Sequence, residues 1–125
     1  MNLLLDTHAL LWWLDNPSKL TKEARTAIAE GRNQVRVSAA VVWEIEIKKA
    51  RGKLRAPDNL KEVLEEERFI PLPITIPHVL ALAGLPPIHE DPFDRIQAAQ
   101  AKLEGLTLVT RDKTLKEYGI PFISA

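Results

Sequence analysis

Five short apolar segments alternate with stretches of helical character, and this alternation constrains the fold more than any other feature of the sequence. The segments are NLLLD, QVRVS, FIPLP, LTLVT and PFIS. Short apolar runs bounded by turn residues predict buried strands, and strands that alternate with helices predict a parallel sheet. We therefore expect an α/β fold with a central parallel sheet of about five strands flanked by helices.

The stretches between these strands carry recognisable helix ends. Five residues are candidate N-caps: Thr21, Ser38, Asp58, Thr75 and Asp91. Glycines predict helix ends near Gly31, Gly52 and Gly105. Pro92 directly follows its cap, where a proline lacks only an amide hydrogen that the first turn cannot use. A short helix or turn is expected after Arg111.

Length and composition predict a single domain over residues 1–125. The chain contains no cysteine, which excludes disulfides, thiolate zinc sites and thiol catalysis. Its apolar beginning is interrupted by Asp6 and His8 and closed by Asp15, too soon for a membrane span, so we expect a soluble cytoplasmic protein. Basic and acidic residues both number 17, so a polyanion would have to be held by a local patch.

Two aspartates follow predicted strands. Asp6 ends the first strand, and Asp112 lies two residues beyond the LTLVT strand. Ligands of parallel α/β sheets bind at the carboxyl ends of the strands, so both side chains are expected at the functional edge. Each also has a purely structural interpretation, Asp6 as a helix cap and Asp112 as a cap or turn residue.

Glu44 lies inside a predicted helix, where its orientation follows from the helical period. It shares a face with Ala40, Val41 and Ile47, so it points toward packed structure. A buried carboxylate needs a cation, a hydrogen-bond donor or a proton. The alternative is a partly exposed Glu44 that pairs with Lys48 at the next turn.

Two aspartates also begin the helix that contains DPFDRIQAAQA. Asp91 is placed to cap the free amides, which leaves Asp94 in the first turn. Asp94 could complete a capping box, but it shares a stripe with Ala98 and Ala101, which suit close approach to a sheet. We interpret Asp91 as the cap and Asp94 as an inward-facing acid.

Four carboxylates at one edge would repel one another, and a divalent cation would relieve the repulsion. Oxygen ligands without cysteine favour Mg²⁺, with Mn²⁺ as the alternative, and such a site suits phosphoryl chemistry. The three histidines, His8, His78 and His89, have no ligand spacing and are expected to be packing or surface residues.

The segments LLLDTHALLWWL, SAAVVWEI, HEDPFDRIQAAQA and LVTRDKTL together resemble the PIN-domain ribonucleases, and more narrowly the VapC toxins of type II toxin–antitoxin pairs. The resemblance covers essentially the whole chain in order. It implies a PIN-like three-layer fold and a prokaryotic, Mg²⁺-dependent endoribonuclease toxin. The residues that match the family's acidic quartet, as catalytic residues and metal ligands, are Asp6, Glu44, Asp94 and Asp112. Thr110 matches the family's hydroxyl residue near the metal.

The resemblance also implies a mechanism and partners. A water molecule activated by the metal would hydrolyse an RNA phosphodiester in line, leaving 5′-phosphate and 3′-hydroxyl ends. The partners implied are an RNA substrate, a VapB-like antitoxin and a second copy of the chain in a homodimer, with no membrane.

Basic residues near the acids are candidates for binding RNA: Lys49, Arg51, Lys53, Arg95 and Arg111. The first three belong to KKARGKLR, which is equally well explained as a solvated helix end. Trp12, Trp13 and Trp43 could stack bases, but core or interface positions are expected for them.

Three rival interpretations can be compared with the sequence. A receiver-type signalling domain needs an aspartate after the third strand, and FIPLPIT has none. A phosphohydrolase with an aspartate nucleophile would need a second acid at the position of His8. The third rival is a non-catalytic metal-binding or antitoxin-binding α/β module, in which the acids are only caps.

Overall fold

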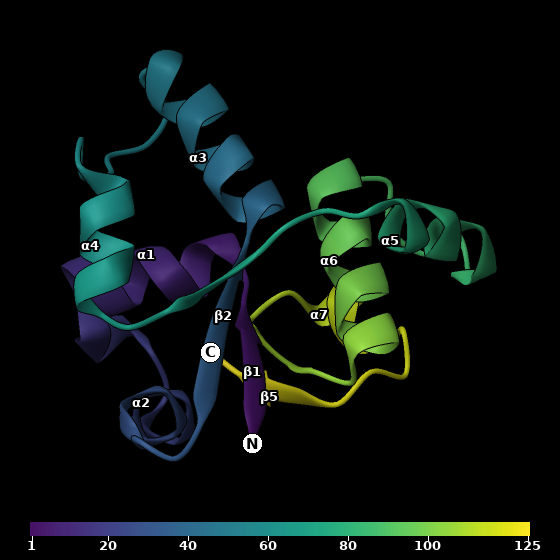
Figure 1. Cartoon of the computed structure of the whole chain (residues 1–125), viewed down its shortest axis with the longest axis horizontal. Coiled ribbons are helices and arrows are strands. Elements are labelled where there is room, and N and C mark those ends of the chain that lie inside the picture. The colour runs from purple at the N-terminus through teal and green to yellow at the C-terminus, as the bar shows by residue number, and fades with distance from the viewer.

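The computed structural model describes residues 1–125, and a five-stranded parallel sheet runs through its centre (Figure 1). The strands are β1 Asn2–Leu5, β2 Gln34–Ser38, β3 Ile70–Leu72, β4 Thr107–Thr110 and β5 Phe122–Ser124. Their order is β3-β2-β1-β4-β5, and every neighbouring pair is parallel. All five strands were expected from the sequence, and the predicted parallel α/β sheet is confirmed.

Seven α-helices cover the two faces of this sheet (Figure 1). They are α1 Thr7–Asp15, α2 Lys22–Ala29, α3 Ala39–Ala50, α4 Leu60–Glu66, α5 Ile76–Ala81, α6 Pro92–Glu104 and α7 Lys113–Lys116. Helices α1 to α4 pack with one apolar cluster, and α5 to α7 lie on the side of a second cluster. The fold therefore has the expected three layers, with the sheet between two layers of helices. No helix has the length and apolar character needed to cross a membrane.

Strand β1 separates the two clusters because its side chains alternate between the faces of the sheet. Leu3 and Leu5 belong to the cluster under α1 to α3, whereas Leu4 packs with Ala98 and Leu108 on the other face. All three leucines of β1 are fully buried. Truncating such a leucine to alanine costs about 2–5 kcal/mol, so β1 anchors both layers.

Most predicted helix ends agree with the structure. Thr21, Ser38, Thr75 and Asp91 are side-chain N-caps of α2, α3, α5 and α6. Gly105 ends α6 in the left-handed conformation, with φ 67°. Helix α2 ends at Ala29, shortly before the expected Gly31.

The cap predicted at Asp58 is wrong. Helix α4 begins at Leu60, and its N-cap is Asn59, which makes no side-chain capping bond. The exposed Asp58 carboxylate instead lies 2.6 Å from the Nζ of Lys49, across the turn that follows α3. Asp58 therefore forms an ion pair with Lys49 instead of capping α4.

The strand order changes direction at β1, because the chain first adds β2 and β3 on one side and later β4 and β5 on the other. Such a switch point leaves a crevice at the carboxyl ends of the central strands. Asp6 directly follows β1, and Asp112 lies two residues beyond β4. The topology thus brings together two acids from opposite ends of the chain.

Candidate active site

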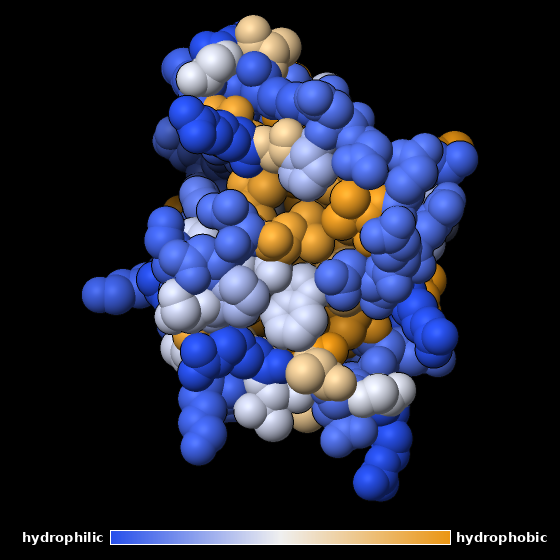
Figure 2. Space-filling view, turned by 90° about the vertical axis from the view of Figure 1, so that its left-hand side faces the viewer, coloured by the Kyte–Doolittle hydropathy of each residue, from blue (hydrophilic) through white to orange (hydrophobic).

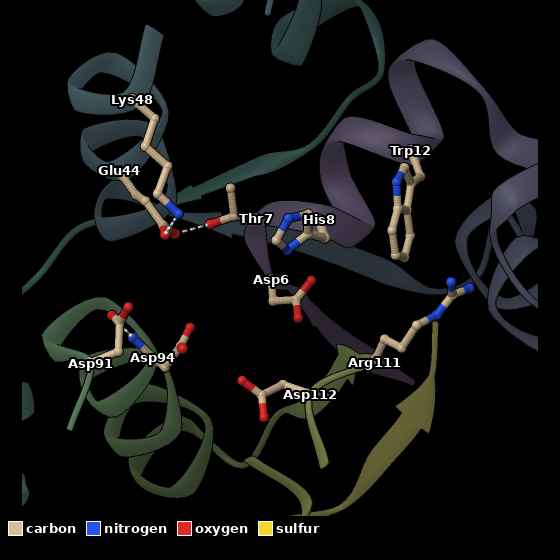
Figure 3. A pocket seen from close by; sticks show the side chains of 10 residues that line it. All are labelled: Asp6, Thr7, His8, Trp12, Glu44, Lys48, Asp91, Asp94, Arg111 and Asp112. Carbon is tan, nitrogen blue, oxygen red and sulfur yellow. Dashed lines mark hydrogen bonds and ion pairs between the residues drawn. The ribbon is translucent and has the colours of Figure 1, made fainter. Parts of the chain in front are cut away.

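A cavity of about 430 Å³ opens at the carboxyl ends of the central strands (Figure 3). Its lining is almost entirely polar: Asp6, Thr7, His8, Trp12, Glu44, Lys48, Asp91, Asp94, Arg111 and Asp112. The four acids expected at the site all line it: Asp6 directly follows β1, Glu44 lies in α3, Asp94 in α6, and Asp112 in the segment after β4. Figure 3 shows their side chains arranged around a common space.

Asp6 both caps a helix and lines the cavity. One oxygen, Oδ1, accepts a hydrogen bond of 2.8 Å from the amide of Ala9, in the first turn of α1. Burial raises the pKa of Asp6, against the opposing effect of hydrogen bonds from Thr110 and Ala9. The two interpretations of Asp6 are therefore compatible, since capping occupies only one of its two oxygens.

The buried side chain of Thr110 joins Asp6 to Asp112. Its hydroxyl accepts a bond of 3.0 Å from the amide of Asp112, and it lowers the pKa of Asp6. A carboxylate of Asp112 then caps α7 by accepting from the amide of Thr114. The hydroxyl residue expected near the metal thus lies between two of the acids.

Glu44 is buried, and each of its two carboxylate oxygens has a partner. Its Oε1 accepts a hydrogen bond from the hydroxyl of Thr7, and its Oε2 lies 2.7 Å from the Nζ of Lys48. The hydrogen bond with Glu44 is the main cause that raises the pKa of Lys48. The inward orientation is confirmed, and the expected alternative pairing with Lys48 occurs without exposing the carboxylate.

The division of roles between Asp91 and Asp94 also agrees with the sequence. Oδ1 of Asp91 accepts from the amides of Phe93 (2.8 Å) and Asp94 (3.2 Å), so Asp91 is the cap of α6. Burial is the main cause that raises the pKa of Asp94 to about 7, followed by the charge of Asp91. Ala98 and Ala101 on the same stripe are buried against the sheet, as expected.

His89 is the site residue that the sequence did not reveal. Its Nε2 lies 3.0 Å from Oδ2 of Asp94 and 3.0 Å from Oδ2 of Asp112, so its expected role as a packing or surface residue is wrong. These three ligand-type atoms lie within 4.8 Å of one another. The spacing rule missed His89 because its partners belong to α6 and to the segment before α7.

The contact between His89 and the acids shifts the pKa of His89 and the pKa of Asp112. Burial acts to lower the pKa of His89, but the hydrogen bond with Asp112 and the charges of Asp94 and Asp112 outweigh it and raise the pKa. Burial acts to raise the pKa of Asp112, but hydrogen bonds from His89 and from the amide of Thr114 hold it below its ordinary value.

The other two histidines agree with expectation. His78 is buried and completes the capping box of α5. His8 is exposed at the rim of the cavity, with its ring 5.6 Å from that of Trp12.

The basic residues are distributed differently from the sequence prediction. Of the five candidates for binding RNA, Arg111 alone lines the cavity. Its guanidinium lies 4.2 Å from the centre of the Trp12 ring and donates to the carbonyl of Ala125. Lys48 also lines the cavity; it begins the candidate stretch KKARGKLR but was not singled out within it. Its position four residues after Glu44 was the available signal.

The remaining four candidates face elsewhere. Lys49 pairs with Asp58, and Arg51 and Lys53 are exposed beyond the end of α3. The guanidinium of Arg95 donates to the carbonyls of Pro86 and Leu82, in the loop before α6, at 3.1 and 3.3 Å. Arg95 therefore holds this loop in place.

The tryptophans differ in their surroundings. Trp12 faces the cavity, Trp13 packs against the core, and Trp43 is exposed with its ring edge-on to Phe93. Trp43 borders a second pocket of about 610 Å³, lined mainly by apolar side chains of α3, α4 and the β2–β3 edge. Figure 2 shows an apolar hollow below α3 on the side of the molecule that carries α1 and α4.

The donor set of the polar cavity fits a divalent cation. Asp6, Glu44, Asp94 and Asp112 offer carboxylate oxygens from four directions, and no sulfur ligand is present. Such oxygen sets suit Mg²⁺ or Mn²⁺ rather than zinc. Burial of Asp6 and Asp94 favours their protonated forms, which a bound cation would reverse.

Comparison with known proteins gives consistent results. The family model described as PIN domain matches residues 3–121. Ribonuclease VapC22 of Mycobacterium tuberculosis is 30% identical over 124 residues, which cover 94% of this chain and 92% of that protein.

Solved structures share the fold. The structure of VapBC2 from Rickettsia felis bound to a promoter DNA fragment gives a TM-score of 0.74 at 16% identity, with 98% of both chains covered. That of VapBC-1 from nontypeable Haemophilus influenzae gives 0.69 at 19% identity, covering 99% of this chain and 98% of the other. A toxin–antitoxin complex from Klebsiella pneumoniae gives 0.64 at 22% identity, covering 97% and 95%.

Proposed function

We propose that residues 1–125 of this chain, which belongs to the PIN-domain family, act as one domain. This domain would be a metal-dependent endoribonuclease and the toxin of a VapBC-like toxin–antitoxin pair. The observation that supports this proposal most strongly is that four acids from four separate parts of the chain line one cavity. The similarity to a protein named Ribonuclease VapC22 supports RNA as the substrate.

The four acids, Asp6, Glu44, Asp94 and Asp112, would hold the cation, and Mg²⁺ suits them best, with Mn²⁺ as the alternative. When bound, such a cation lowers the pKa of a water molecule and stabilises charge on a phosphate. The protein's own contribution is orientation. Thr7 fixes one oxygen of Glu44, and Thr110 links the loops that carry Asp6 and Asp112.

Two cationic side chains at the cavity are suited to the phosphates of the RNA. Lys48 and Arg111 lie on opposite sides of the cavity in Figure 3, and both line it. A phosphodiester between them would lie beside the acids, where in-line attack by water would leave 5′-phosphate and 3′-hydroxyl ends. Lys49, Arg51, Lys53 and Arg95 stay candidates for contacts with a longer strand.

The antitoxin would occupy apolar surface. The structural relatives are described as VapBC or toxin–antitoxin complexes, and the apolar pocket beside Trp43 suits an amphipathic helix. We also propose a homodimer that acts in the prokaryotic cytoplasm, where RNA and antitoxin are both present.

The direct test is an RNA cleavage assay on the purified protein, with EDTA and then with Mg²⁺. Wild type should cleave only with the metal. Asp6→Asn and Asp94→Asn should abolish cleavage and remain folded, whereas Asp15→Asn, an exposed change at the end of α1, should cleave normally. Metal binding without cleavage by the wild type would favour the alternative of a non-catalytic module.

A further inference from the structure

Both ring nitrogens of His89 have partners. Nδ1 accepts a hydrogen bond of 3.2 Å from the backbone amide of Asp91. Nε2 lies 3.0 Å from a carboxylate oxygen of Asp94 and 3.0 Å from one of Asp112. The ring therefore bridges a backbone donor on one side and two acceptors on the other.

This arrangement determines where the ring carries its proton. An amide N–H can point at Nδ1 only if that nitrogen presents a lone pair, and a neutral imidazole then carries its hydrogen on Nε2. The imidazolium form, which the charges of Asp94 and Asp112 favour, would place two N–H groups against each other at Nδ1, whereas Nε2 carries a hydrogen in both forms. Nε2 is thus a donor to the carboxylates, and a protonated nitrogen has no lone pair for a metal ion.

The main chain of His89 is fixed as firmly as its ring. Its amide donates to the hydroxyl of the buried Tyr118 at 3.0 Å, and its carbonyl accepts from Arg95 at 3.5 Å. Arg95 also donates to the hydroxyl of Tyr118 and to the carbonyl of Leu82. These bonds hold the loop so that Nε2 is directed at the two acids.

We propose that His89 is a positioning residue, which holds Asp94 and Asp112 at a fixed spacing by donating from Nε2 and stays outside the coordination shell of the cation. The proposal rests on the proposed function, in which both acids hold the metal. Asp94 belongs to α6 and Asp112 precedes α7, and their charges repel each other. A shared donor reduces that repulsion and orients both carboxylates before a cation enters.

The first test measures the tautomer in the wild-type protein. Long-range ¹H–¹⁵N correlation spectra of the histidine rings, recorded in EDTA at about pH 8 so that ordinary histidines are neutral, should show His89 with its hydrogen on Nε2. His78 is an internal reference, because its Nδ1 accepts from the amide of Thr75 and its Nε2 faces Glu104. His89→Gln identifies the signals by their loss.

Addition of Mg²⁺ completes this test. The proposal expects the Nε2 hydrogen of His89 to remain while the signals shift. A hydrogen on Nδ1, either before or after Mg²⁺ is added, would make Nε2 a lone-pair ligand and overturn the proposal. This result requires no variant other than the one used for assignment.

The second test compares two substitutions by calorimetric titration with Mn²⁺. His89→Leu keeps bulk but removes the donor, so affinity should fall by about 10–100-fold, as for other residues that orient metal ligands. Glutamine places an N–H group near the position of Nε2, so His89→Gln should keep most of the affinity. Equal losses in the two variants, or no loss in His89→Leu, would contradict the proposed role.

The two tests also separate this proposal from the proposed ribonuclease activity. A correct tautomer and rescue by glutamine in a protein that does not cleave RNA would leave the positioning role intact and remove only the activity. Cleavage by a protein whose His89 carries its hydrogen on Nδ1 would support the ribonuclease activity and remove the positioning role.

Discussion

Replacing Asp94 by asparagine should stabilise the metal-free protein, although this side chain belongs to the proposed active site. The Asp94 side chain is 20% exposed, and burial, followed by the charge of Asp91, raises its pKa to about 7. Asparagine has nearly the same shape and keeps an oxygen that can accept from Nε2 of His89. The substitution therefore removes an unfavourable charge and retains the hydrogen bond.

The size of the effect follows from the pKa. A rise from 3.8 to about 7 corresponds to an upper limit of about 4 kcal/mol at 1.4 kcal/mol per unit. Because the folded carboxyl binds its proton more tightly than the unfolded one, the penalty is absent below about pH 4 and complete above about pH 7. Loss of a favourable charge at the start of α6 offsets about 0.5 kcal/mol.

Urea denaturation in EDTA, at about pH 5.5 and about pH 8, measures this difference. The stability advantage of Asp94→Asn over wild type should be larger at the higher pH by about 2 kcal/mol, because roughly half of the ionisation penalty develops in that interval. Asp15→Asn is a matched loss of one exposed charge and should change stability by less than about 0.5 kcal/mol at either pH.

Two results would refute the reasoning. If the advantage of Asp94→Asn were the same at both pH values, the ionised carboxylate would not be the source of the instability. If the variant were less stable than wild type at pH 8, Asp94 would act as a structural acid. Saturating Mg²⁺ should reverse the order, because a ligand that binds only the folded state stabilises it, and wild type binds the cation better.

Three further predictions concern the substrate, the metal and regulation. Lys48→Gln should reduce the slope of log RNA affinity against log salt concentration by about 0.7, as measured by filter binding. Joint replacement of Lys49, Arg51 and Lys53 by glutamine should reduce the same slope by about 2. An unchanged slope in the triple variant would show that this stretch is a solvated helix end. Glu44→Gln should raise the Mg²⁺ concentration needed for half-maximal cleavage by about 10-fold, while RNA affinity in EDTA persists; unaltered Mg²⁺ dependence would exclude Glu44 from the metal site. Expression of the protein alone should arrest growth, and co-expression of an antitoxin gene encoded beside it should restore growth; harmless expression of folded, cleaving protein would contradict the toxin role.

The sequence predicted the acidic part of the site because simple geometry governs it. Parallel strands end at one edge, so Asp6 and Asp112 had to lie near each other once their strands were identified. The period of α3 likewise oriented Glu44, and the stripe of α6 oriented Asp94. These four positions follow from local periodicity and from the direction of the strands.

The rest depends on contacts between elements, which spacing along the chain does not encode. The partners of His89 lie on α6 and before α7, and Lys49 reaches Asp58 across a turn, which displaced the expected cap. The sequence placed Lys48 in the basic stretch KKARGKLR and as a possible partner of Glu44, but it did not predict that Lys48 lines the cavity. In hindsight, His89 two residues before an N-cap is the local signal, because its Nδ1 can accept from the amide of that cap.

The position of β1 at the centre of the sheet determines when the cavity can be completed during synthesis of the chain. Leu5 pairs with Val37 of β2, but its other neighbour, Val109 of β4, lies about 100 residues later in the chain. At translation rates of about 5–20 residues per second, roughly 5–20 seconds separate the synthesis of the two strands. A ribosome-bound or truncated chain without β4 lacks both Thr110 and Asp112 and leaves one edge of β1 unpaired. Under the proposed function, an interrupted translation product would lack two of the residues assigned to the site and should not cleave RNA.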